Sequence, residues 1–169
     1  MRKINYLQII FHFIATCFFI YSFYSYSAIY NIKILTAISE NGSENVLRNS
    51  EKFGITIIDV WNFSFITQLS AVLGILTSFI ISMVISIKNK WSVWNSFIVL
   101  VLCYTLNRFD LLGWSYLKTY ISPGRLVNNL LFSFLITGSF LLLIGLIIFF
   151  SNFLKTRIEN QKLKQMHCC

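Results

Sequence analysis

Four long stretches of this chain contain no Asp, Glu, Lys or Arg, and they restrict the folds that it can adopt. They run from Ile4 to Ile32, Val60 to Ile87, Trp91 to Asn107 and Leu126 to Leu154. A helix that crosses the hydrocarbon core of a membrane needs about 20 mainly apolar residues. Only 12% of the residues are charged, against about a quarter in soluble domains. The sequence therefore predicts an all-α membrane protein with four transmembrane helices in an antiparallel bundle.

The chain divides into a four-helix transmembrane domain, residues 1–154, and a basic cytoplasmic tail, residues 155–169. We place the spans at about 4–30, 61–87, 91–112 and 127–154; the third reaches full length only by including Leu111 and Leu112. The connector 31–59 contains the turn signal Asn41-Gly42-Ser43. We expect short interfacial helices in this connector and in the segment 111–121.

The charges of the connectors predict the orientation. On one side of the predicted bundle, eight basic residues face one acid, whereas six basic residues face five acids on the other. Cytoplasmic loops are enriched in Lys and Arg. We therefore expect both termini inside. Separately, its recurring small residues make the segment 61–87 the expected packing centre.

Small residues recur every four positions in the second span. A row of small side chains lets another helix backbone approach closely in a membrane. This pattern favours packing within the four-helix unit, leaves packing between subunits open, and also fits a water-lined face. The predicted helix-packing or oligomer face consists of Ser70, Gly74, Ser78, Ser82 and Ser86.

Polar residues at helical spacing form a stripe on the first span: Asn5, Gln8, His12 and Thr16. Such a stripe avoids lipid and is expected to face the bundle interior, another subunit or a water-filled cavity. His12 fits a structural histidine, a proton-sensing or ion-path group, or a metal ligand, in that order of preference.

Three further features attract attention. Arg108 and Asp110 at the end of the third span are expected to form an outer ion pair, and Gln68 and Asn95 add hydrogen-bonding capacity between helices. The tail is expected to continue the fourth span as a helix that binds anionic lipid or a protein partner. Its basic residues are Lys155, Arg157, Lys162 and Lys164.

Catalysis is not expected. The sequence has no Cys-x-x-Cys pair and no glycine-rich phosphate loop, and no pair of carboxylates that would act together. We expect no cofactor, no resident metal and no direct nucleic-acid binding.

Two non-enzymatic classes of function remain. In the first, the chain is a homo-oligomeric membrane platform or sensor that anchors a cytosolic effector protein. In the second, the homo-oligomer is itself a pore, a channel or a holin-like effector. The scarcity of charge inside the spans weighs against a selective ion channel.

The chain resembles the small four-span membrane subunit of the Kiwa-type bacterial anti-phage system. The resemblance lies in the chain length, the Met1-Arg2-Lys3 start, the four spans and the basic segment from Lys155 to Lys164, and it covers the whole chain at the level of topology. It implies a homotetramer in a bacterial inner membrane that recruits a cytosolic DNA-binding effector in antiviral defence.

Overall fold

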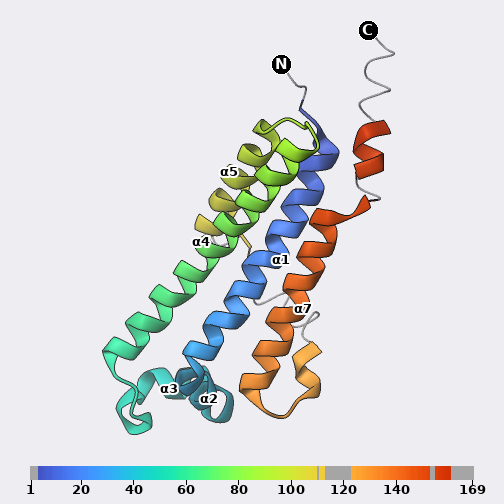
Figure 1. Cartoon of the computed structure of the whole chain (residues 1–169). Coiled ribbons are helices and arrows are strands. Elements are labelled where there is room, and N and C mark those ends of the chain that lie inside the picture. Colours follow the sequence, from blue (N-terminus) through green and yellow to red (C-terminus); the bar gives the residue numbers. More distant parts are fainter. Residues whose placement is uncertain (1–3, 110, 113–122, 153–154, 161–169) are drawn as a thin grey trace.

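Helices account for all regular secondary structure in the part of the chain that the computed structural model describes, residues 4–109, 111–112, 123–152 and 155–160 (Figure 1). In chain order, the elements are α1 (Tyr6–Tyr30), α2 (Ile32–Asn41), α3 (Ser43–Arg48), the 3-10 helix η1 (Ser50–Phe53), α4 (Ile57–Lys88), α5 (Trp94–Arg108), the 3-10 helix η2 (Pro123–Leu126) and α7 (Leu130–Phe150). The all-α prediction is confirmed for these residues.

Helix α1 lies at the centre of the bundle. It packs along α4 and α7 and also contacts α5, whereas α4 and α7 have few contacts with each other (Figure 1). The expectation that the segment 61–87 would be the packing centre is therefore wrong. The buried residues of α4 lie on one face, which accommodates one neighbour, whereas those of α1 extend around most of its circumference.

Three helical stretches are long and apolar enough to cross a membrane: Tyr6–Tyr30, Ile57–Lys88 and Leu130–Asn160. Helix α5 has only 15 residues, so it extends about 22 Å against a hydrocarbon core of about 30 Å. The third predicted span, 91–112, therefore stays a prediction, and with it the total of four spans. Most of the expected interfacial segment 111–121 lies outside the described residues.

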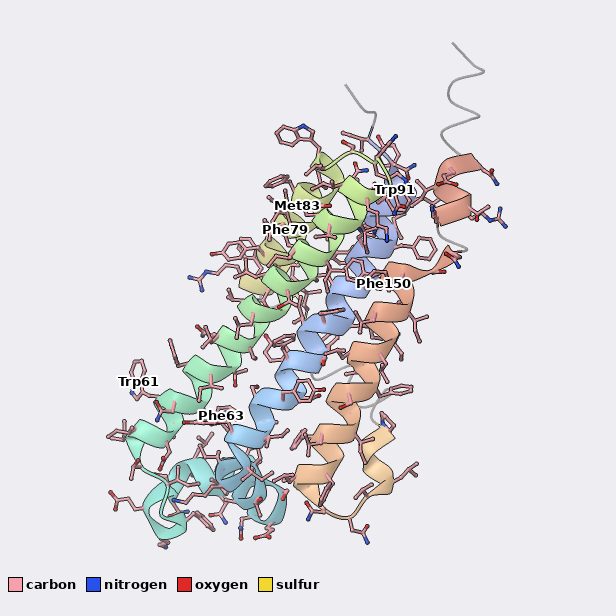
Figure 2. All side chains as sticks on the ribbon, in the orientation of Figure 1. Trp61, Phe63, Phe79, Met83, Trp91 and Phe150 are labelled. Atoms are coloured by element: carbon pink, nitrogen blue, oxygen red, sulfur yellow. The ribbon has the colours of Figure 1, made fainter. Side chains whose placement is uncertain are left out.

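The outward faces of the long helices are apolar. Phe65, Ile80 and Val84 of α4 and Leu143 and Ile147 of α7 are all exposed. A soluble monomer rarely exposes contiguous apolar surface on this scale. Trp61, near the start of α4, points away from the bundle (Figure 2).

Helices α2 and α3 and the turn η1 form a small cap over one end of the bundle, as Figure 1 shows. Ile34, Val46 and Ile55 are its buried core. Gly42 separates α2 from α3 with a φ of +80°, a conformation that favours glycine, so the turn predicted at this position is confirmed. We call this end of the molecule the cap end.

The opposite end holds the start of α1, the α4–α5 connector and residues 155–160 (Figure 1), and we call it the connector end. The backbone N–H of Trp91 donates to the carbonyl of Ser86 at 2.8 Å, which closes the tight turn after α4. Helix α7 ends at Phe150 because Ser151 is extended. The tail was expected to continue the fourth span as a helix. Residues 155–160 instead follow a break at Ser151.

Candidate functional site, a buried polar cluster

Polar side chains from three helices meet inside the bundle near the connector end. We call this set the polar cluster, and all of its members are buried. It consists of Asn5, Gln8 and His12 from the start of α1, Ser82 and Ser86 from α4, and Asn95 and Ser96 from α5.

Two amide side chains connect the three helices. The Nδ2 group of Asn95 donates to Oε1 of Gln8 at 2.6 Å, and Nε2 of Gln8 donates to Oγ of Ser86 at 2.7 Å. Oδ1 of Asn95 accepts the backbone N–H of Asn5 at 3.3 Å. Each amide therefore uses both its oxygen and its nitrogen, as buried amides must to avoid the cost of desolvation.

Three serine hydroxyls form a chain with one direction of donation. Ser86 Oγ donates to the carbonyl of Ser82 at 2.8 Å, so it accepts from Ser96 Oγ, which lies 3.1 Å away. Ser82 Oγ donates to Ser96 Oγ at 2.7 Å. Because each hydroxyl carries one proton, Ser82 can only accept from a further donor.

His12 is that donor. Its Nδ1 lies 2.6 Å from Ser82 Oγ, whose only proton is already directed at Ser96. The imidazole therefore carries a proton on Nδ1. Its Nε2 is buried and has no hydrogen-bond partner in the described part of the structure.

Apolar side chains close the polar cluster at the connector end. The ring of His12 lies edge-on to Phe149, with centroids 5.1 Å apart, and 6.2 Å from the ring of Trp91. Ile158, from the helical segment 155–160, is fully buried in the same apolar cluster as Trp91 and Phe149. Figure 2 shows Trp91 between the start of α1 and this segment.

The structure brings together the two patterns that the sequence shows on separate spans. All five small residues of α4 are buried, and two of them, Ser82 and Ser86, meet the stripe of α1 in the polar cluster. The hydroxyls of Ser70 and Ser78 instead donate to carbonyls of their own helix. Thr16, the last member of the stripe, likewise donates to the carbonyl of His12.

Gly74 lies at a close approach of α4 to α1. A Cβ atom at this position would lie 2.9 Å from Cα of Ile20 and 3.2 Å from the carbonyl oxygen of Phe19. Only a residue without a side chain permits this approach. The small face of α4 is therefore used within one chain, against α1.

The remaining predicted residues are not part of the polar cluster. Arg108 is exposed at the end of α5, and Asp110 lies outside the described residues. Lys155 and Arg157 are exposed on the segment 155–160, whereas Lys162 and Lys164 also fall outside the described part.

Ser96 is a site residue that sequence reasoning missed. It links the serines of α4 through two hydrogen bonds. The signal was present, because Ser96, Val99 and Cys103 recur at helical spacing and all face the interior. A lone serine in a serine-rich membrane protein gives no reason to single it out.

The polar cluster joins three helices through direct hydrogen bonds. His12 and Ser82 are as close as a nucleophile and its base, but the proton points from the imidazole to the hydroxyl, opposite to what activation requires. Both groups are buried. In the described residues, no three His, Cys, Asp or Glu side chains could hold a metal ion together.

No protein-family model, no curated protein and no solved structure matches this chain.

Proposed function

We propose that this chain is a non-enzymatic, homo-oligomeric membrane platform that anchors a cytosolic effector protein at the connector end. The observation that supports it is the charge at this end. Lys88, Lys90, Lys155 and Arg157 are exposed there, with Glu159 as the acidic residue among the described ones. A basic surface of this kind attracts an acidic protein partner or anionic lipid.

The same charges support an orientation with both termini in the cytoplasm. Figure 1 shows the start of α1 and residues 155–160 at one end of the molecule, an arrangement that supports an even number of crossings. We propose α5 as a fourth span beside the three long apolar helices. The enrichment of cytoplasmic loops in basic residues then puts the connector end inside.

Cysteine labelling tests this orientation. In a variant without the native cysteines, Ser43→Cys on the cap should react with a membrane-impermeant maleimide in intact cells, because α3 is then outside. Lys88→Cys should react only after the cells are opened, since the end of α4 is then inside. Both positions border a helix end outside the buried core. Labelling of Lys88→Cys alone in intact cells contradicts the orientation.

A homo-oligomer would have to use a surface other than the small face of α4, which α1 already occupies. The exposed apolar faces of α4, α5 and α7 offer that surface. A tetramer and a role in anti-phage defence are supported by the resemblance to the Kiwa-type membrane subunit.

Charge reversal at the connector end tests the recruitment of an effector. The double variant Lys155→Glu/Arg157→Glu should reduce about tenfold the amount of the soluble protein that co-purifies with the parent chain from its native cells, since two close charge pairs contribute about 1.4 kcal/mol or more. Both side chains are exposed, so insertion and oligomer mass should not change.

The matched control is Lys52→Glu, an exposed charge reversal on η1 at the cap end, which should leave co-purification intact. If the double variant retains the partner and the purified chain alone conducts ions in liposomes, the platform is refuted in favour of a pore.

A further inference from the structure

The exposed basic residues at the connector end come from two parts of the chain that are far apart in sequence. Lys88 and Lys90 border the turn between α4 and α5, whereas Lys155 and Arg157 lie on the segment 155–160. Figure 1 shows both parts at the connector end. The contacts that hold these parts in place decide whether they present one basic surface or two.

The segment 155–160 packs on the bundle through one buried side chain. Ile158 has no exposed surface, whereas the other five residues of the segment are exposed. The extended backbone at Ser151 ends α7, so α7 does not fix the direction of the segment. The backbone N–H of Lys155 donates to the carbonyl of Ser151 at 3.2 Å, a bond to the chain just before the segment. Ile158 is thus the side chain by which the segment docks.

The apolar cluster that receives Ile158 also holds the other basic part. Its members include Ile85, near the end of α4, and Trp91, which directly follows Lys90. Trp91 is only 2% exposed, and Figure 2 shows it between the start of α1 and the segment. The two basic parts are therefore anchored in one cluster.

A polar side chain in place of Ile158 should undo this arrangement without changing any charge. The isoleucine contributes buried apolar surface, and a polar group at its position would be buried at a cost in free energy. The segment can avoid that cost by leaving the cluster, because its other side chains are already exposed. The turn after α4 would stay, since the backbone bond from Trp91 to Ser86 closes it.

We propose that Ile158 is a positioning residue that joins the two basic parts into one composite surface, and that the acidic effector contacts both parts at once. Basic groups held together raise the local potential that attracts an acidic protein. A partner bound to one part is then already close to the other. The identity of the partner rests on the proposed function, whereas the assembly of the composite surface does not.

Distances between spin labels test this assembly in the full chain, reconstituted in liposomes. Labels at Asn89→Cys and Thr156→Cys, in a variant without the native cysteines, report on the two parts and alter no charge. The docked segment should give one narrow distance distribution. Ile158→Asn should broaden it, and Ile158→Val should keep it narrow. A narrow distribution in Ile158→Asn, or a broad one with Ile158 in place, overturns the proposal.

The matched control is Leu47→Asn, the same change from an aliphatic to an amide side chain at an exposed position of the cap. It should leave the distribution narrow, and a broad one would refute a specific role of Ile158. Ile158→Ala removes apolar contact without placing a polar group in the cluster. It should also broaden the distribution, and it takes the place of Ile158→Asn if that variant does not insert.

Binding of a defined acidic probe tests the composite surface. A fluorescent decaglutamate peptide is titrated onto the chain in liposomes of phosphatidylcholine, a lipid without net charge. Lys88→Glu and Lys155→Glu should each weaken binding about fivefold, since each removes an exposed charge pair. Ile158→Asn should weaken it to a similar extent, whereas Ile158→Val should bind like the parent. Equal binding by Ile158→Asn and the parent, or no loss for Lys88→Glu, contradicts a composite surface.

Recruitment of the effector and assembly of the composite surface can fail separately. If the distances and the peptide behave as expected but Lys155→Glu/Arg157→Glu keeps its protein from native cells, the composite surface stands and recruitment fails. If that double variant loses the protein while Ile158→Asn leaves the distances unchanged, recruitment stands and the composite surface fails.

Discussion

Gly74→Ala should destabilise the assembly of α1 with α4 by about 3 kcal/mol, at the upper end of what overpacking costs in a tight core. The new methyl group would lie 2.9 Å from Cα and 3.1 Å from N of Ile20. These are backbone atoms of the central helix, so relief requires α1 and α4 to separate. Unfolding in mixed detergent micelles, followed by circular dichroism, measures the change.

The matched control is Gly138→Ala on α7. The three atoms nearest to a Cβ atom there belong to the ring of Tyr26, at 3.0 to 3.2 Å. A side-chain ring can rotate, so we expect a loss below about 1 kcal/mol, offset in part by the better helix propensity of alanine. Equal effects of the two substitutions would show that α4 packs no more closely against α1 than α7 does.

Gln8→Leu and Asn95→Leu should each destabilise the bundle by about 2 kcal/mol, because each leaves one polar atom of the other buried amide without its hydrogen-bond partner. Gln8→Leu removes the acceptor of the Asn95 amide and a donor to Ser86. The double variant removes both side chains of the Asn95–Gln8 hydrogen bond, so neither amide is left with an unsatisfied polar atom. Its loss should therefore fall short of the sum by about 1 kcal/mol, within the range measured between membrane helices.

The control for this cycle is Gln68→Leu, the same substitution at an exposed glutamine of α4. In lipid-free detergent it should change the stability by less than about 0.5 kcal/mol. Strict additivity of Gln8→Leu and Asn95→Leu would contradict a direct bond between the two side chains.

The residues of the long helices could be predicted from the sequence because lipid imposes a simple rule on composition. Uncharged stretches of sufficient length predicted α1, α4 and α7, and the turn signal at Gly42 predicted the break between α2 and α3. The stretch from Trp91 to Asn107 also predicted α5, but the predicted span ran on to residue 112, whereas α5 ends at Arg108. Hydropathy does not show where the chain turns, so it could not give this end.

The candidate site was predictable in part for a different reason. Helical spacing shows which residues of one helix share a face, so it identified His12 and Ser82 separately. It carries no information about which faces meet, and the partnership of α1 with both α4 and α5 emerges only in three dimensions. For the same reason the sequence did not distinguish a packing centre on α4 from one on α1.

The polar cluster has a consequence for how the protein is made. Gln8 bonds to Ser86 and Asn95, which follow it by 78 and 87 residues. During synthesis, α1 is therefore complete long before any of its polar partners leaves the ribosome. Moving a helix with an unsatisfied polar stripe into lipid costs free energy. We therefore expect α1 to remain beside the insertion machinery until the α4–α5 hairpin has been synthesised. Helix α1 would then be synthesised before α4 and α5 but would reach its final position in the membrane only together with them.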